Sequence, residues 1–222
     1  MKAPLVGGSN PAVLLLKMGH STKRNYFTIL FFTTFLVVLL LVVTGFTAGF
    51  DKAAGESVSF LRTPVLTAIM KFFTAIGMSY LMTALFLVLL ITLLILGRKK
   101  AALFLSVAMA AGVVSEILKL LIHRARPENG IIPETGYSFP SQHALFSAIY
   151  FLAIWYSFRN DIKNKTARLL FFFTNVLMFL VIGFSRIYLG VHWLSDVVAG
   201  WALGIAIVSL AASVIFSKSV PD

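Results

Sequence analysis

The sequence predicts an all-α, polytopic membrane protein with six transmembrane helices and an interfacial helix between the first two. Hydrophobic residues make up 59% of the 222 residues, charged residues only 12%, and the mean hydropathy is +0.94. Soluble domains carry about 25% charged residues, so this composition indicates a membrane protein. Six apolar segments also have roughly the ~20 residues that a helix needs to cross a bilayer.

Each predicted span is a continuous apolar segment bounded by more polar residues. The approximate limits are Phe27–Ala48, Met78–Gly97, Ala101–Ile122, Ser141–Phe158, Leu169–Ile187 and Trp193–Phe216. The segment between the first two, Gly49–Gly77, is too mixed in polarity for a span. Its apolar residues Val58, Leu61, Val65 and Ile69 recur at helical spacing, which predicts a helix lying at the membrane interface.

The sequence contains no long linker, soluble domain or tandem repeat. We therefore expect residues 1–26 to form a cytoplasmic N-terminal segment and residues 27–222 to form one six-helix membrane domain. An alternative is a cleavable signal from Lys23 to Ala48. Its apolar core of about twenty residues exceeds the ~7–15 of a typical signal, which favours a retained first helix. The chain has no cysteine, which excludes disulfides, thiolate catalysis and cysteine metal sites.

Basic residues are distributed unequally between the two sides of the predicted helices. Twelve of the 19 lysines and arginines fall on the side of the N-terminus: Lys2, Lys17, Lys23, Arg24, Arg98, Lys99, Lys100, Arg159, Lys163, Lys165, Arg168 and Lys218. Short loops rich in these residues stay in the cytoplasm, so both termini are predicted to be cytoplasmic in the cell membrane. The charge of +11 does not indicate a nucleic-acid partner, because the basic residues flank apolar segments and form no continuous stripe.

The first candidate motif is Lys119-x6-Arg126-Pro127, at the predicted extracytoplasmic end of the third span. Seven residues make nearly two helical turns, so Lys119 and a helical Arg126 would share a face about 10 Å apart and grip one phosphate. Pro127 disfavours helical geometry at Arg126. Snorkelling to the headgroup layer is the alternative for either cation. Glu116, one turn before Lys119, is expected to pair with it structurally.

The second motif is Pro140-Ser141-Gln142-His143, which opens the fourth span. Proline and serine at a helix start leave backbone N–H groups that attract anions, so this turn is a candidate phosphate cradle. His143 lies in the first turn, where it can give a proton to a departing oxygen. Ordinary helix capping with an interfacial histidine is the alternative.

The third motif is Ser185-Arg186-x5-His192-x3-Asp196. Four residues apart on a helix, Asp196 can accept a proton from one ring nitrogen of His192 and orient the other for nucleophilic attack. Arg186 adds a cation that neutralises phosphoryl oxygens in the transition state. Alone, a His/Asp pair is more often a structural contact, and a metal site is a further alternative. Ionisable groups at the ends of apolar segments are costly and are functional by default.

In their order along the chain, the three motifs resemble the type-2 phosphatidic acid phosphatase superfamily. Its signature is Lys-x6-Arg-Pro, then Pro-Ser-Gly-His, then Ser-Arg-x5-His-x3-Asp. The first and third motifs match fully, whereas Gln142 replaces the glycine of the second. The signature covers Lys119–Asp196, and the six-helix layout extends the resemblance to most of the chain.

The resemblance implies a metal-independent phosphatase that hydrolyses a phosphomonoester or pyrophosphate of a membrane lipid, without cofactor or obligatory protein partner. His192 would attack phosphorus and form a phosphohistidine, Asp196 would orient it, and His143 would protonate the leaving oxygen. The residues expected to hold the phosphoryl group are Lys119, Arg126, Ser141, Gln142 and Arg186. Phosphatidylglycerophosphate or a related lipid phosphate is the expected substrate, and undecaprenyl pyrophosphate is the alternative.

Two further hypotheses and one departure from the signature remain. An anion or lipid transporter would use the cations Lys119, Arg126 and Arg186 without cleaving phosphate. A metal hydrolase would use His123 with His143, His192 and Asp196.

Gln142 preserves the backbone N–H that a phosphate cradle needs, since glutamine is a better helix former than glycine. We expect its side chain to narrow the mouth of the site or to bond to the substrate.

Overall fold

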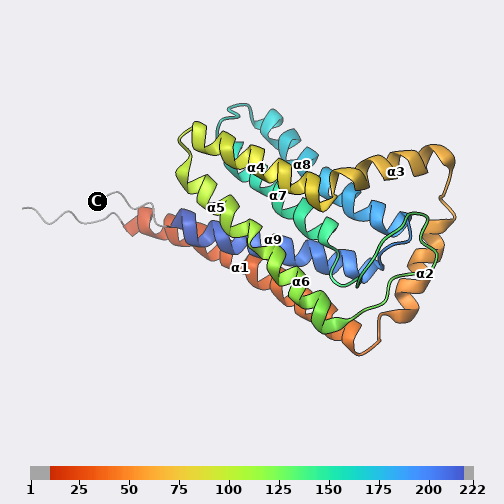
Figure 1. Cartoon of the computed structure of the whole chain (residues 1–222). Helices are drawn as coiled ribbons and strands as arrows, with labels where there is room; N and C mark the ends of the chain where they lie inside the picture. Colours follow the sequence, from red (N-terminus) through yellow and green to blue (C-terminus); the bar gives the residue numbers. More distant parts are fainter. Residues whose placement is uncertain (1–10, 218–222) are drawn as a thin grey trace, which may run out of the picture.

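The structure is a computed structural model that describes residues 11–217, which form nine helices (Figure 1). These are α1 (Pro11–Val43), α2 (Ala48–Ser59), α3 (Pro64–Ile76), α4 (Ser79–Ile95), α5 (Lys99–Met109), α6 (Ala111–Ile122), α7 (Gln142–Phe158), α8 (Lys165–Tyr188) and α9 (Leu194–Ser217). The all-α prediction is confirmed for this part of the chain.

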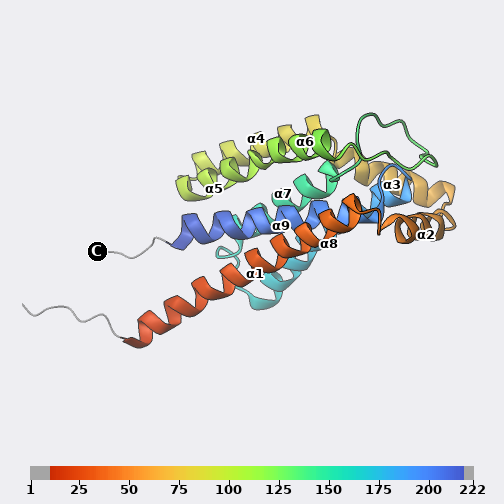
Figure 2. The same cartoon turned by 90° about the horizontal axis from the view of Figure 1, so that it is seen from below.

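The two most central helices are α7 and α9. In Figure 2 they lie between α4, α5 and α6 on one side and α1 and α8 on the other. Half of the apolar segment of α9 is buried, whereas only 6% of the apolar segment of α1 is buried. Helix α1 contacts the rest of the bundle mainly through α9. The core between the helices is apolar and includes Met82, Leu93, Phe104, Leu105, Leu145, Ile149 and Ile182. Much of the remaining apolar surface faces outward, as expected of a protein surrounded by lipid.

Within residues 11–217, four helical segments are long and apolar enough to cross a membrane: Asn25–Val43, Lys99–Ile122, Lys165–Tyr188 and Leu194–Phe216. A fifth results if α3 and α4, which meet at a bend of 54°, count as one span. The chain is therefore a multi-pass membrane protein. The remaining predicted span, the fourth along the chain, coincides with α7, whose 17 residues extend only about 25 Å and fall short of a ~30 Å hydrocarbon core. The count of six stays a prediction.

The segment predicted as a single interfacial helix forms two helices, α2 and α3. The break occurs because Thr63 caps a new helix, accepting a 3.2 Å hydrogen bond from the N–H of Leu66, and Pro64 occupies its first position. Gly77 ends α3 beside the first turn of α7. A Cβ there would lie 2.6 Å from the ring of His143, so only glycine permits this approach. The position of α2 and α3 at a membrane interface stays a prediction.

The predicted boundary at residue 26 falls inside a helix, because α1 begins at Pro11. The division into residues 1–26 and 27–222 therefore does not follow a break in secondary structure, and its cytoplasmic assignment stays a prediction. Lys2 and Lys218, both counted in the charge asymmetry, lie outside the described residues.

Candidate active site

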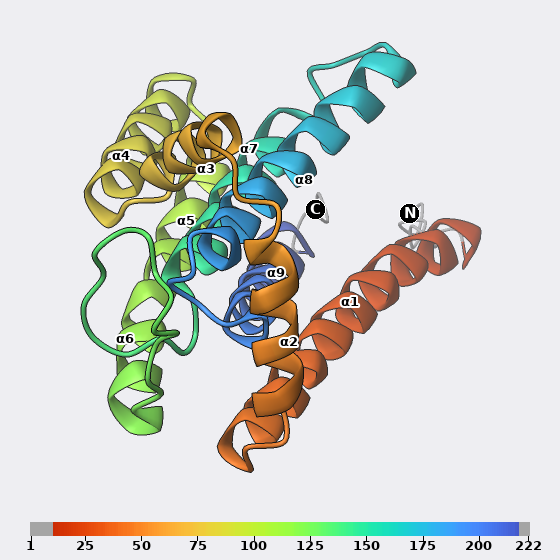
Figure 3. The same ribbon diagram turned by 90° about the vertical axis from the view of Figure 1, so that its right-hand side faces the viewer.

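The three sequence motifs come together at one end of the bundle, next to α2 and α3 (Figure 3). There α7 and α9 begin, α8 ends, and the 123–141 segment returns from α6 to α7. A cavity of about 420 Å³ opens at this end and is lined by Arg126 and His192 together with Lys52 and Glu56 of α2.

His192 and Asp196 form the buried centre of this region, with 3% and 0% of their surfaces exposed. The Nδ1 atom of His192 lies 3.4 Å from Oδ2 of Asp196. The same oxygen accepts a 2.9 Å hydrogen bond from the backbone N–H of Trp193, which fixes the carboxylate. The i, i+4 spacing thus produces the predicted juxtaposition, although His192 itself precedes α9.

The imidazole of His192 is held in one protonation state and one tautomer. Burial lowers the pKa of His192 to about 4, although the nearby Asp196 opposes the shift, so the ring is neutral near neutral pH. Its Nε2 lies 3.0 Å from Nη1 of Arg126. A guanidinium only donates, so Nε2 must be the acceptor and the ring proton resides on Nδ1, facing Asp196. The lone pair required for nucleophilic attack is therefore on Nε2.

Arg126 reaches the site from a loop, so the two-turn helical arrangement with Lys119, which Pro127 disfavours, does not form. Helix α6 ends at Ile122, and His123 adopts a left-handed conformation with φ of 51°. Pro127 further disfavours helix at Arg126. The guanidinium is instead fixed by backbone carbonyls, donating to Val191 at 2.8 Å, Gly136 at 3.0 Å, Thr135 at 3.1 Å and Tyr137 at 3.3 Å.

Lys119, the other cation of the first motif, remains on α6. Its Nζ lies 3.5 Å from a carboxylate oxygen of Glu116, the structural pair expected from their spacing. Gln142 also donates to Glu116 through its side-chain amide. The side chain of Gln142 is thus directed toward α6, where it contributes to a contact that includes the partner of Lys119. This differs from the expected position at the mouth of the site.

Ser141 is the N-cap residue of α7, and its backbone N–H donates to the carbonyl of Asp196 at 3.1 Å. This contact joins the second motif to the third. The start of α7 lies close to α9 because Gly200 has no side chain. A Cβ at Gly200 would lie 2.6 Å from the carbonyl oxygen of Ser141.

Arg186 is almost fully buried, with 1% of its side chain exposed, and it contacts a residue that the sequence did not single out. Its Nη1 donates to the hydroxyl of Thr74 on α3 at 2.5 Å, and its Nη2 pairs with Glu134. The other carboxylate oxygen of Glu134 lies 3.8 Å from Nη2 of Arg126. Glu134 therefore places a negative charge between two of the arginines that are expected to bind phosphate.

Glu134 remains ionised in this position. Burial raises its pKa, but the guanidinium groups of Arg186 and Arg126 outweigh burial and hold the pKa of Glu134 below its usual value. One weak signal for this role is present in the sequence, since Glu134 is an acidic residue between the first two motifs. It is explained equally well as one of the acidic residues that offset the basic residues in the predicted extracytoplasmic loops.

A second missed contact involves Arg124 and Asp51. Arg124 donates from Nη1 to Asp196 at 2.5 Å and from Nη2 to Asp51, 1% exposed, at 2.7 Å. Asp51 also accepts from the N–H and hydroxyl of Ser195, at 2.9 and 2.7 Å. This network links α2 to the carboxylate behind His192. The sequence offered no periodic signal for it, because Asp51 and Arg124 are 73 positions apart.

Unpaired polar atoms are concentrated in the same region. Of the seven buried side-chain nitrogen and oxygen atoms without a hydrogen-bond partner in the described part of the chain, four belong to predicted site residues: Ser141 Oγ, His143 Nε2, Arg186 Nε and His192 Nδ1. The last of these faces Asp196 at 3.4 Å. Buried polar groups are normally paired, so the other three are candidates to bind a polar ligand.

The alternative metal site with four contributing residues does not assemble. Among residues 11–217, no three histidine, aspartate or glutamate side chains gather in a way that could hold a metal ion. His123 instead packs edge-on against Tyr137, with ring centroids 4.5 Å apart.

The sequence profile of the PAP2 superfamily matches residues 99–219, more than half of the chain and all three motifs. The chain belongs to the PAP2 superfamily. It is thus an enzyme of a superfamily of membrane lipid phosphatases and pyrophosphatases, which confirms the resemblance seen in its motifs.

Two relatives are similar to this chain over most of their own length. Phosphatidylglycerophosphatase B of Bacillus subtilis is 26% identical over 190 residues, which cover 78% of this chain and 87% of the relative. Undecaprenyl-diphosphatase of Sulfolobus acidocaldarius is 26% identical over 195 residues, covering 82% and 87%.

Solved structures show the same PAP2 fold. The transmembrane PAP2-type phosphatidylglycerolphosphate phosphatase of Bacillus subtilis superposes with a TM-score of 0.79, at 24% identity, over 88% of this chain and 98% of its own. LpxE of Aquifex aeolicus gives a TM-score of 0.56, also at 24% identity, over 71% and 91%.

Proposed function

We propose that this protein is a metal-independent lipid phosphatase that works through a phosphohistidine on His192. The observation that carries the proposal is the neutral His192, with Asp196 at Nδ1 and the lone pair of Nε2 directed toward Arg126 at the cavity. Phosphatidylglycerophosphate or a related lipid phosphate is the proposed substrate, with undecaprenyl pyrophosphate as the alternative. The two relatives, which are named as a phosphatidylglycerophosphatase and an undecaprenyl-diphosphatase, support these two proposed substrates.

The reaction has two steps. In the first, Nε2 of His192 gives up its hydrogen bond from Arg126 and bonds to phosphorus, while the bond to the leaving oxygen breaks and His143 gives that oxygen a proton. In the second, His143 takes a proton from water, which attacks phosphorus and breaks the P–N bond to release phosphate. Asp196 stabilises the positive ring throughout, and the phosphoryl oxygens are held by cations and donors of the three motifs. This group consists of Lys119, Arg126, Ser141, Arg186 and the first turn of α7 at Gln142.

Substrate binding in this scheme requires Glu134 to leave its place between Arg186 and Arg126. The Glu134 carboxylate and the substrate phosphate are both anions, and they compete for the same guanidinium donors. Glu134→Gln removes the competing charge, so we expect orthovanadate, a phosphate analogue, to inhibit at about tenfold lower concentration, equivalent to roughly 1.4 kcal/mol. The measurement is the inhibition constant of orthovanadate for the wild type and for Glu134→Gln, both in the same detergent. Asp161→Asn is the control, because it removes a carboxylate from an exposed ion pair with Arg98 and lies outside the active-site cavity. Equal or weaker inhibition of Glu134→Gln would contradict the competition.

We also propose that the site faces the extracytoplasmic side. The support is the charge asymmetry of the loops and the location of all three motifs at one end of the bundle. A cysteine at Asn129, exposed in the loop before the second motif, should react with a membrane-impermeant thiol reagent in intact cells. A cysteine at Asn164, exposed before α8, should react only after the cells are opened. The reverse pattern would overturn the orientation, and no native cysteine interferes.

The decisive test of the proposed activity is phosphate release by purified protein from a panel of lipid phosphates in excess chelator. Release of phosphate that persists in chelator supports histidine chemistry, since a metal-generated nucleophile would be lost. Lipid phosphates that bind without phosphate release would instead indicate the transporter hypothesis. Rates for phosphatidylglycerophosphate and undecaprenyl pyrophosphate in one panel rank the two proposed substrates.

A further inference from the structure

A second cavity lies at the opposite end of the bundle from the candidate active site. It has a volume of about 680 Å³, within the range of sites that bind small organic ligands. Its walls come from α1, α7, α8 and α9. The 17 residues of α7 separate its start, at Gln142, from Arg159 at the rim of this cavity, a distance of roughly 25 Å along the helix.

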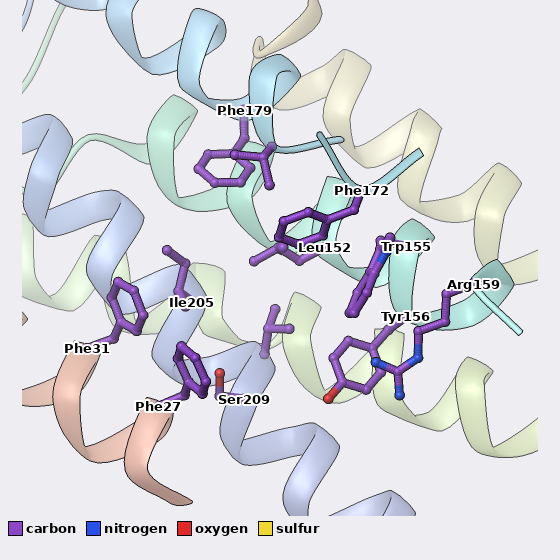
Figure 4. Close-up of a pocket in the computed structure, with 12 residues that line it drawn as sticks. Phe27, Phe31, Leu152, Trp155, Tyr156, Arg159, Phe172, Phe179, Ile205 and Ser209 are labelled. Carbon is purple, nitrogen blue, oxygen red and sulfur yellow. The ribbon is translucent and has the colours of Figure 1, made fainter. Parts of the chain in front are cut away.

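The lining of the cavity is apolar and rich in aromatic rings. Figure 4 shows aromatic and aliphatic side chains around a central space, among them Phe27, Phe31, Leu152, Phe172 and Phe179. Phe27 is 56% exposed, so the apolar wall continues onto the outer surface of the bundle. A protein surrounded by lipid presents such an opening to acyl chains. The shape and lining therefore suit a hydrocarbon chain that enters from the bilayer.

One edge of the cavity is cationic. The guanidinium carbon of Arg159 lies 3.9 Å from the ring centroid of Tyr156 and 4.7 Å from that of Trp155, so two rings fix its position. The neighbouring loop carboxylate, Asp161, pairs with Arg98 at 2.7 Å. In the described part of the chain Arg159 forms no ion pair. The charge of Arg159 is thus held at the rim, while the carboxylate of Asp161 is already paired with Arg98.

Trp155 belongs to the same wall and lies against the guanidinium of Arg159. An apolar chamber with a fixed cation at its rim matches an acyl chain attached to an anionic head group. Basic pockets between transmembrane helices are known to bind such lipids.

We propose that this cavity binds an anionic diacyl phospholipid of the leaflet opposite the active site, with an acyl chain among the aromatic rings and its phosphate at Arg159. The ligand is a bound membrane lipid and not a substrate, because the cavity is distant from His192. The proposal does not depend on the catalytic assignment.

Trp155 allows a direct test, because brominated acyl chains quench a nearby indole. The protein is placed in phosphatidylcholine bilayers that contain increasing fractions of brominated phosphatidylglycerol or brominated phosphatidylcholine. The signal of Trp155 is the difference between the wild type and Trp155→Phe. One arginine contributes about 1 kcal/mol toward an anionic lipid, so half-maximal quenching should need about fivefold less brominated phosphatidylglycerol. Equal quenching by both lipids would overturn the proposal.

Two matched pairs of variants locate the site. Arg159→Gln should abolish the preference for phosphatidylglycerol, whereas Arg168→Gln, in an exposed part of α8 outside the cavity lining, should retain it. Ser209→Phe fills the cavity and should reduce quenching by both lipids. Leu210→Phe, on the adjacent exposed face of α9, should not. If Arg168→Gln lost the preference as fully as Arg159→Gln, or if Leu210→Phe reduced quenching as much as Ser209→Phe, binding would be diffuse and the proposal wrong.

Discussion

His192→Ala is expected to reduce phosphate release by at least about 1,000-fold, in line with the losses that follow removal of a nucleophile that acts with a paired base. The reason is geometric. Nε2 of His192 carries the lone pair at the cavity, and His143 cannot both attack phosphorus and protonate the leaving oxygen. Initial rates on the best lipid of the panel measure the loss, and elution as a single folded species in detergent shows that the protein is intact.

The matched control is His123→Asn, which replaces a histidine at a variable position of the first motif by a residue that tolerates its left-handed conformation. It should retain most of the activity. Asp196→Asn should lose less than His192→Ala, because the nucleophile remains while its orientation weakens. Near-normal release by His192→Ala would eliminate the covalent mechanism, whatever the control shows.

Arg124→Met is expected to give the largest loss of stability, about 3–5 kcal/mol in the free energy of unfolding, because it leaves Asp51 and Asp196 as unpaired buried charges. Both carboxylates are at most 1% exposed, and both accept hydrogen bonds from the one guanidinium. Denaturant titration in a single detergent measures the change. Adding Asp51→Asn to Arg124→Met should recover part of the loss, since it removes one of the two stranded charges.

Arg98→Met is the matched control for this network. Arg98 also forms an ion pair at 2.7 Å, with Asp161, but the two side chains are 31% and 51% exposed. Exposed pairs contribute about 0–1 kcal/mol, so the control should lose far less. Similar losses for Arg124→Met and Arg98→Met would show that the buried network does not stabilise the site.

Much of the helical framework was predictable because its signals are local. Long apolar segments correspond to the described helices: Ser141–Phe158 differs by one residue at its start from α7. The break between α2 and α3 was not predicted, although Thr63 and Pro64 carry a recognisable helix start. The apolar periodicity that continued across them favoured one helix, and local capping prevailed.

By itself, the sequence determined the membrane class, the family and the residues of three motifs, including the close approach of His192 and Asp196. These properties depend on composition and on short spacings, which at a helix or its start place side chains close together. Pro127 disfavoured helix at Arg126, but only the tertiary structure decided that its guanidinium meets His192. The tertiary structure also decided that Glu134 lies between Arg186 and Arg126 and that Arg124 joins Asp51 to Asp196. Contacts between distant positions depend on how helices and loops pack, so no local pattern encodes them.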